Sequence, residues 1–240
     1  MSDLGIPSIE EILRKGIDRV VEKSNVSNLS NLIGESSLSE VIVEIEGTAH
    51  RIYLEEEMEA VNNLLKNRGI PAREANLASE VFIKEDLVTR LANTRRVRGG
   101  LTSERILRVV LASLGIPCEK GRIKAKGYRP DIAVPSNEAL RKSPSKAVAI
   151  AVKRTLRERW AEDIDVFSSF KNGKFVLLLP DPDFNESKAG DMVNRGMKKV
   201  YINDGLYEQN KSFMTDEFRK HSQLPSDILE VIGTTQKKLA

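Results

Sequence analysis

The residues best suited to chemistry in this sequence are Asp131, which follows Tyr128-Arg129-Pro130, and Lys153, which ends an apolar run. A carboxylate at the start of one strand and a lysine at the end of its neighbour can share a cleft. There the carboxylate can hold Mg²⁺ and the ammonium can help to activate water, as phosphodiester hydrolysis requires. A plain alternative also fits, in which the two residues are a turn aspartate and a surface lysine.

Three consecutive residues after Lys153 carry side chains that match the edges of bases. Arg157 and Arg159 could each donate two hydrogen bonds to O6 and N7 of guanine, and Glu158 could accept one from N4 of cytosine. At a helix tip in the major groove they would favour G·C pairs. The alternative is a solvated helix face with salt bridges.

Short strands with helices between them must position these residues. Residues 147–152 are all apolar, as expected of a strand that is buried on both faces at the centre of a sheet. The pattern predicts an α/β fold, a mixed sheet flanked by helices. We expect strands at residues 119–125, 131–134, 147–153, 175–179 and 200–202, and helices after Arg154 and after Asn185.

The first ninety residues have mainly helical patterns. Amphipathic helices are predicted at 8–22 and 54–67, around an alternating stretch at 41–45 that predicts a strand. Thr102 and Ser103 are candidate caps for a further helix that would run to Ser113.

The basic, glycine-containing run at 94–100 marks the expected boundary between a mainly helical lobe, 1–93, and a catalytic domain, 94–240. Residues 1–90 hold 10 Lys and Arg against 17 Asp and Glu, a net charge of −7. The remainder holds 28 against 18, a net charge of +10. A polyanion would therefore dock on the basic C-terminal part.

Composition excludes several classes of protein. The 240 residues are 40% hydrophobic and 30% charged, which is ordinary for a globular protein. No apolar stretch approaches the roughly 18 residues of a membrane helix, and the N-terminus lacks a signal-peptide pattern. We expect a cytoplasmic protein, in which the single Cys118 forms no internal disulfide.

Two motifs together resemble a known family. They are Arg-Pro-Asp at 129–131 and, at the family's spacing from it, Val-Lys-Arg-Thr-Leu-Arg-Glu-Arg-Trp at 152–160. Both resemble type II restriction endonucleases of the PD-(D/E)XK superfamily, in the branch that contains the EcoRII catalytic domain and the enzymes that cut CCNGG, CCWGG or related CCGG sites. The resemblance covers residues 98–207.

The resemblance implies a restriction-endonuclease-like sheet and Mg²⁺-dependent cleavage of double-stranded DNA at a short palindromic site containing CC and GG. Asp131 would bind the metal, Lys153 would be the catalytic lysine, and Glu104 would support a metal. The G·C pairs would be read by Arg157, Glu158 and Arg159. A palindrome read by one helix per half requires two copies, so we expect a homodimer, with the helical lobe as an accessory to binding or dimerisation.

One position departs from the usual superfamily pattern, because Ala151 stands two residues before the lysine, where an acid is common. In the resembled branch this carboxylate has moved to the following helix, at a position occupied here by Val166. Glu162 lies roughly 40° from that direction around a helix and has the longest reach, so we choose it as the second catalytic and metal-binding acid. Asp163 and Asp165 remain alternatives, although Asp163 would fall on the apolar helix face.

Other candidate residues are assigned to structure. Asp181, Asp183 and Glu186-Ser187-Lys188 spell a literal PD…ExK, but no strand fits between Asp183 and Glu186. That segment fits a turn followed by the acidic first turn of a helix better. His50 and His221 lack partners at metal or triad spacing, and Trp160 fits core packing.

Two other functions remain open from the sequence. One is a DNA-binding protein of the same fold that has lost cleavage. The other is a structure-specific repair nuclease, which would not need a rigid tip that reads G·C pairs. Asp131 and Lys153 favour the endonuclease over the first of these.

Overall fold

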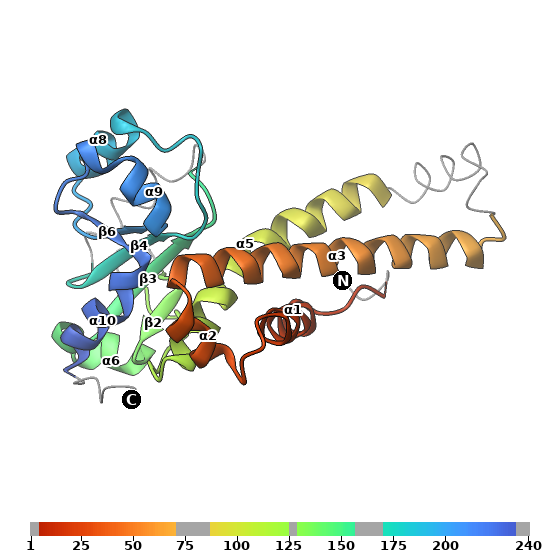
Figure 1. Cartoon of the computed structure of the whole chain (residues 1–240), viewed down its shortest axis with the longest axis horizontal. Coiled ribbons are helices and arrows are strands. Elements are labelled where there is room, and N and C mark those ends of the chain that lie inside the picture. Colours follow the sequence, from red (N-terminus) through yellow and green to blue (C-terminus); the bar gives the residue numbers. More distant parts are fainter. Residues whose placement is uncertain (1–4, 71–86, 125–128, 157–169, 234–240) are drawn as a thin grey trace. The chain divides into compact units, whose positions relative to one another are not determined.

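The computed structural model describes residues 5–70, 87–124, 129–156 and 170–233, which form two compact units (Figure 1). One unit, which is helical, contains residues 1–25 and 44–102; the other, which contains the sheet, comprises residues 26–43 and 103–240. Helix α3 (Leu38–Asn67) and helix α5 (Leu87–Ser113) each contribute to both units.

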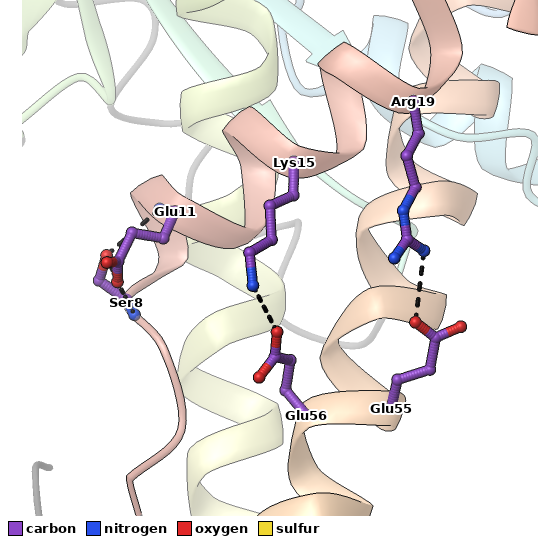
Figure 2. A network of polar contacts seen from close by, with 6 residues as sticks. All are labelled: Ser8, Glu11, Lys15, Arg19, Glu55 and Glu56. Carbon is purple, nitrogen blue, oxygen red and sulfur yellow. Dashed lines mark hydrogen bonds and ion pairs between the residues drawn. The ribbon is translucent and has the colours of Figure 1, made fainter. Parts of the chain in front are cut away.

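In the helical unit, α1 (Ile9–Lys23) packs on α3 through apolar residues. The helix begins at Ser8, whose Oγ accepts a hydrogen bond from Glu11 N while the Glu11 carboxylate accepts one from Ser8 N. Its Ile12 belongs to a buried cluster with Ile52 and Tyr53 of α3. Two ion pairs flank this contact, Lys15 with Glu56 at 2.6 Å and Arg19 with Glu55 at 3.3 Å (Figure 2). Because both pairs are solvent-exposed, the apolar contact contributes most of the stability.

Two expectations for the N-terminal part were wrong. Residues 41–45 form no strand but lie in α3, where Val41, Ile42, Ile45 and Ala49 are buried at helical spacing. Over only five residues, the helical period of about 3.6 residues resembles the alternation of a strand. Thr102 and Ser103 cap no helix, because α5 begins at Leu87 and passes through them.

The second unit is built on a mixed sheet, as predicted, with its six strands in the order β1-β2-β3-β4-β5-β6. Strand β2 is antiparallel to both of its neighbours, β1 and β3, whereas β3 to β6 are parallel. The strands are β1 (Glu119–Lys120), β2 (Ile132–Val134), β3 (Val148–Lys153), β4 (Gly173–Leu177), β5 (Val200–Ile202) and β6 (Phe218–Lys220). The apolar run predicted to be central is β3, which is buried as far as Val152.

Helices cover the sheet (Figure 1). They pack on it through two apolar clusters. The larger joins β4 to residues of α8 (Glu186–Asn194) and α9 (Asp204–Gln209), and the smaller joins β2 and β3 to Leu140 of α6 (Asn137–Lys142). Within the described residues, the other α-helices of this unit, besides the ends of α3 and α5, are α2 (Leu29–Glu35) and α10 (Leu224–Ile232). Across the described ranges, none of the helices is long and apolar enough to cross a membrane.

His50 is exposed, whereas His221 lies in the core with polar partners that the sequence did not predict. His221 Nε2 lies 2.9 Å from Leu177 O, so this nitrogen carries the proton and donates. Its Nδ1 lies 3.2 Å from Ser39 Oγ, which donates to Asp204 Oδ1 at 2.7 Å. The aspartate contacts the serine rather than the histidine, and Ser39 and His221 are buried. The group is therefore a structural network and not a catalytic triad.

Burial lowers the pKa of His221 to about 4, against the opposing effects of Leu177 O and Asp204. The unfolded chain, with an ordinary histidine, takes up a proton first as the pH falls. Stability from the neutral ring is thus complete above about pH 6.5 and is lost towards pH 4, by about 3 kcal/mol.

We expect His221→Gln to lower the free energy of unfolding at pH 7 and to flatten its pH dependence between pH 6.5 and 4. Urea denaturation at several pH values measures both effects. His50→Gln is the matched control and should keep the wild-type slope. An unchanged slope in His221→Gln would show that other groups cause acid destabilisation.

Candidate active site

Asp131 lies directly before β2, and its side chain reaches the end of β3. Asp131 Oδ2 accepts a hydrogen bond of 2.8 Å from Val152 N, and Asp131 N donates to Ile150 O at 2.9 Å. The carboxylate is therefore held against the backbone amide one residue before Lys153. This geometry brings together two residues that are far apart in the sequence.

Lys153 is the last residue of β3 and is partly buried, unlike the five buried residues before it. Its carbonyl oxygen accepts a hydrogen bond of 2.7 Å from Leu178 N, so the residue that follows β4 holds the strand end on the other side. Lys153 thus carries its ammonium where the apolar centre of the sheet gives way to solvent. A flexible side chain on a fixed backbone can deliver a positive charge to a ligand at this edge.

The close approach of Gly121 to residues Arg129-Pro130-Asp131 fixes the backbone of the candidate site. Gly121 N donates to Asp131 O at 2.9 Å. A Cβ atom on Gly121 would lie 2.0 Å from Pro130 O and 2.7 Å from Pro130 C. Both distances are too short for non-bonded atoms, so the Pro130 backbone would have to move. The absence of a side chain at position 121 therefore determines where Asp131 sits. No motif in the sequence indicated this residue.

Glu104 lies on α5, buried to 8% exposure, beside strand β1. Its Oε2 is 4.0 Å from Lys120 Nζ, and its Oε1 is 3.7 Å from Arg108 Nη1. Lys120 is paired with Ile132, the residue after Asp131, so Glu104 is one strand away from Asp131. Its charge is already compensated by these two cations.

Four predicted site residues lie outside the described residues. They are Arg157, Glu158, Arg159 and Glu162, and the alternatives Asp163 and Asp165 are in the same segment, 157–169.

Asp181 belongs to the rejected PD…ExK segment, and the structure gives it a different importance. As predicted, residues 182–183 form a turn and α8 begins at Glu186. The Asp181 carboxylate, 3% exposed, accepts hydrogen bonds from Asp183 N and from Leu156 N. Leu156 is itself buried, so the chain reaches Arg157 from a fixed point. Only the turn signal Asp-Pro-Asp hinted at this anchoring role.

The oxygen ligands that the described residues offer fit a magnesium ion that is bound mainly by substrate phosphates and water. Mg²⁺ is commonly bound by one or two carboxylates together with phosphates and water molecules. Asp131 supplies such an oxygen ligand at a partly exposed position. Within the described ranges there is no cluster of three or more His, Cys, Asp or Glu residues that could form an all-protein cage.

Comparison with solved structures shows which proteins share this fold. The restriction endonuclease PspGI in a complex with substrate DNA matches with a TM-score of 0.71 and 25% identity, over 95% of this chain and 94% of that chain. Metal-depleted Ecl18kI matches at 16% identity in complexes with uncleaved DNA (TM-score 0.72, 98% of this chain and 81% of that chain) and with uncleaved, modified DNA (0.71, 97% and 82%). The chain therefore has a restriction-endonuclease fold. Neither a scan against protein-family models nor a search of curated proteins gave a match.

We expect Gly121→Ala to destabilise the protein by about 1 to 3 kcal/mol, because the added methyl group must displace the Pro130 backbone. Urea denaturation measures the change. Gly190→Ala in α8 is the matched control, since a Cβ there meets nothing within 4 Å. It should leave stability unchanged or raise it by up to about 1 kcal/mol. Wild-type stability of Gly121→Ala would contradict the close approach.

Proposed function

We propose that the protein is a type II restriction endonuclease that cuts both strands of DNA in the cytoplasm at a short palindromic site containing CC and GG, in a Mg²⁺-dependent hydrolysis. The observation that carries the proposal is the hydrogen bond from Val152 N to Asp131 Oδ2, which holds a carboxylate beside Lys153. The similarity to PspGI, solved with substrate DNA, supports it over 95% of the chain.

The chain's own residues would divide the work of hydrolysis. Asp131 would bind the metal, together with Glu162 and with support from Glu104. Mg²⁺, when bound, would neutralise phosphate charge and lower the pKa of a coordinated water. Lys153 would stabilise the negative charge that develops on the phosphate in the transition state.

Recognition would come from the residues that follow Leu156. In this proposal Arg157 and Arg159 contact guanine and Glu158 contacts cytosine in the major groove. Asp181, by holding Leu156 N, would fix the start of the recognition segment. Because the site is palindromic, the active species would be a homodimer with residues 1–93 as an accessory lobe, which light scattering of the free and DNA-bound protein can test.

We expect Asp131→Ala and Lys153→Ala each to reduce DNA cleavage by at least about 100-fold while specific binding stays measurable, because both groups serve the transition state. Plasmid digestion with Mg²⁺ and gel shifts without it separate the two effects. Asp183→Ala and Lys142→Ala, both exposed, are matched controls and should cut like wild type. If wild type binds a site specifically but never cuts, the protein is a non-catalytic DNA-binding protein.

Glu158→Ala should relax selection at cytosine rather than weaken binding in general, because a carboxylate is repelled by the phosphate backbone. Arg157→Ala and Arg159→Ala should each cost roughly 1 to 3 kcal/mol of discrimination at a G·C pair. Titrations of matched and mismatched duplexes at several salt concentrations measure these effects. A wild-type ratio of matched to mismatched binding in Glu158→Ala would refute the assigned recognition segment.

A further inference from the structure

A second charged site lies at the other end of the parallel strands. Its cavity, of about 850 Å³, opens beside the start of β4 and the residues before β5. Lys174 in its wall pairs with Ile150 of β3, whereas Leu177 pairs with Lys153. Three residues of strand, roughly 10 Å, therefore separate the two lysine positions along the sheet. The cavity is thus distinct from the candidate active site.

The cavity lining has an excess of positive charge. Among the described residues, the lining carries two carboxylates, from Asp227 and Glu230 of α10. Against them stand five cationic side chains: Lys171, Lys174, Lys198, Lys199 and Arg219. Arg219 Nη2 already binds Asp227 Oδ1 at 3.1 Å, so this pair is neutral. The remaining lysines outnumber Glu230, which leaves the cavity attractive to an anion.

Lys174 is the distinctive residue, because its ammonium is buried and makes no direct contact with a carboxylate of the described residues. The side chain is 5% exposed, and Nζ donates to Tyr201 OH at 2.8 Å. Tyr201 OH in turn donates to Asp227 Oδ2 at 2.7 Å, so the negative charge lies one hydroxyl group away. A buried ammonium is costly unless it is paired with an anion.

The pKa of Lys174 reflects the free-energy cost of burying its ammonium. Burial lowers its pKa to about 8, and Asp227 only partly offsets the effect. An anion bound beside Nζ would stabilise the protonated form.

We propose that this cavity binds a phosphate group, with Lys174 as the buried donor and the exposed Lys171 and Lys198 at its rim. Phosphate fits because it offers several strong acceptor oxygens and more than one negative charge to a set of clustered ammonium groups. The volume is large enough for a phosphorylated small molecule of nucleotide size. A backbone phosphate of DNA offers the same chemistry from a different source.

The test is calorimetric titration of the full chain with inorganic pyrophosphate, without divalent metal. We expect wild type to bind, and Lys174→Met to bind at least about 10-fold more weakly, since the buried ammonium of the cavity is removed. Lys66→Met, an exposed change on α3, and Lys153→Met, in the candidate active site, should bind like wild type. Circular dichroism checks folding of each variant. Should Lys174→Met not fold, the exposed double variant Lys171→Ala/Lys198→Ala should weaken binding several-fold.

Competition with a non-specific DNA duplex identifies the source of the phosphate. If the cavity takes a DNA phosphate, pyrophosphate competes with the duplex and Lys174→Met weakens duplex binding. If the cavity takes a small molecule instead, Lys174→Met binds the duplex as wild type does.

Three results would overturn the proposal. One is a failure of wild type to bind pyrophosphate at millimolar concentration, and another is binding of pyrophosphate by both Lys174→Met and the double variant as wild type binds it. The third result is a loss of pyrophosphate binding in Lys153→Met alone. None of these results depends on DNA cleavage, so failure here is distinguishable from failure of the proposed endonuclease activity.

Discussion

The hydrogen bond between Asp131 Oδ2 and Val152 N is the contact on which the candidate site depends, and it exists only in one register of β2 against β3. Successive side chains of a strand point to opposite faces, so a slip of one residue would turn Asp131 away from β3. Strand β2 has only three residues and has little pairing of its own to prevent a slip. The hydrogen bonds from Asp131 N to Ile150 O and from Gly121 N to Asp131 O supply the missing constraint on both sides.

The interior of the sheet provides the rigidity that these short strands lack. Strand β3 is buried along its apolar length, and β4 beside it carries Phe175 and Leu177 in the larger apolar cluster. Burial of these side chains stabilises the pairing of β3 with β4. The positions of the short β2 and of the end of β3 are fixed by this pairing. His221 adds a hydrogen bond to β4, because its ring donates to the carbonyl oxygen of Leu177, the last residue of that strand.

Elements with a strong local pattern could be predicted from the sequence, whereas elements fixed by tertiary contact could not. Strand β3 and helix α8 follow from a continuous apolar run and from a turn followed by an acidic first turn. Strand β6 has two charged residues out of three and was missed; its place in the sheet comes from pairing with β5. The candidate site shows the same division. Asp131 and Lys153 stood out by residue type, but the need for Gly121 arises from backbone packing between segments that only the fold brings together.

Asp131 and Asp181 show why residue type alone cannot assign chemistry to a carboxylate. Both follow a proline, and both occur in a sequence resembling the same motif. Asp181 is 3% exposed and uses one oxygen for Leu156 N and the other for Asp183 N, so binding a metal would cost it two backbone hydrogen bonds. Asp131 is only partly buried, at an edge where a ligand can approach. The buried Asp181 can therefore hold the chain in place, and the partly exposed Asp131 can meet a substrate.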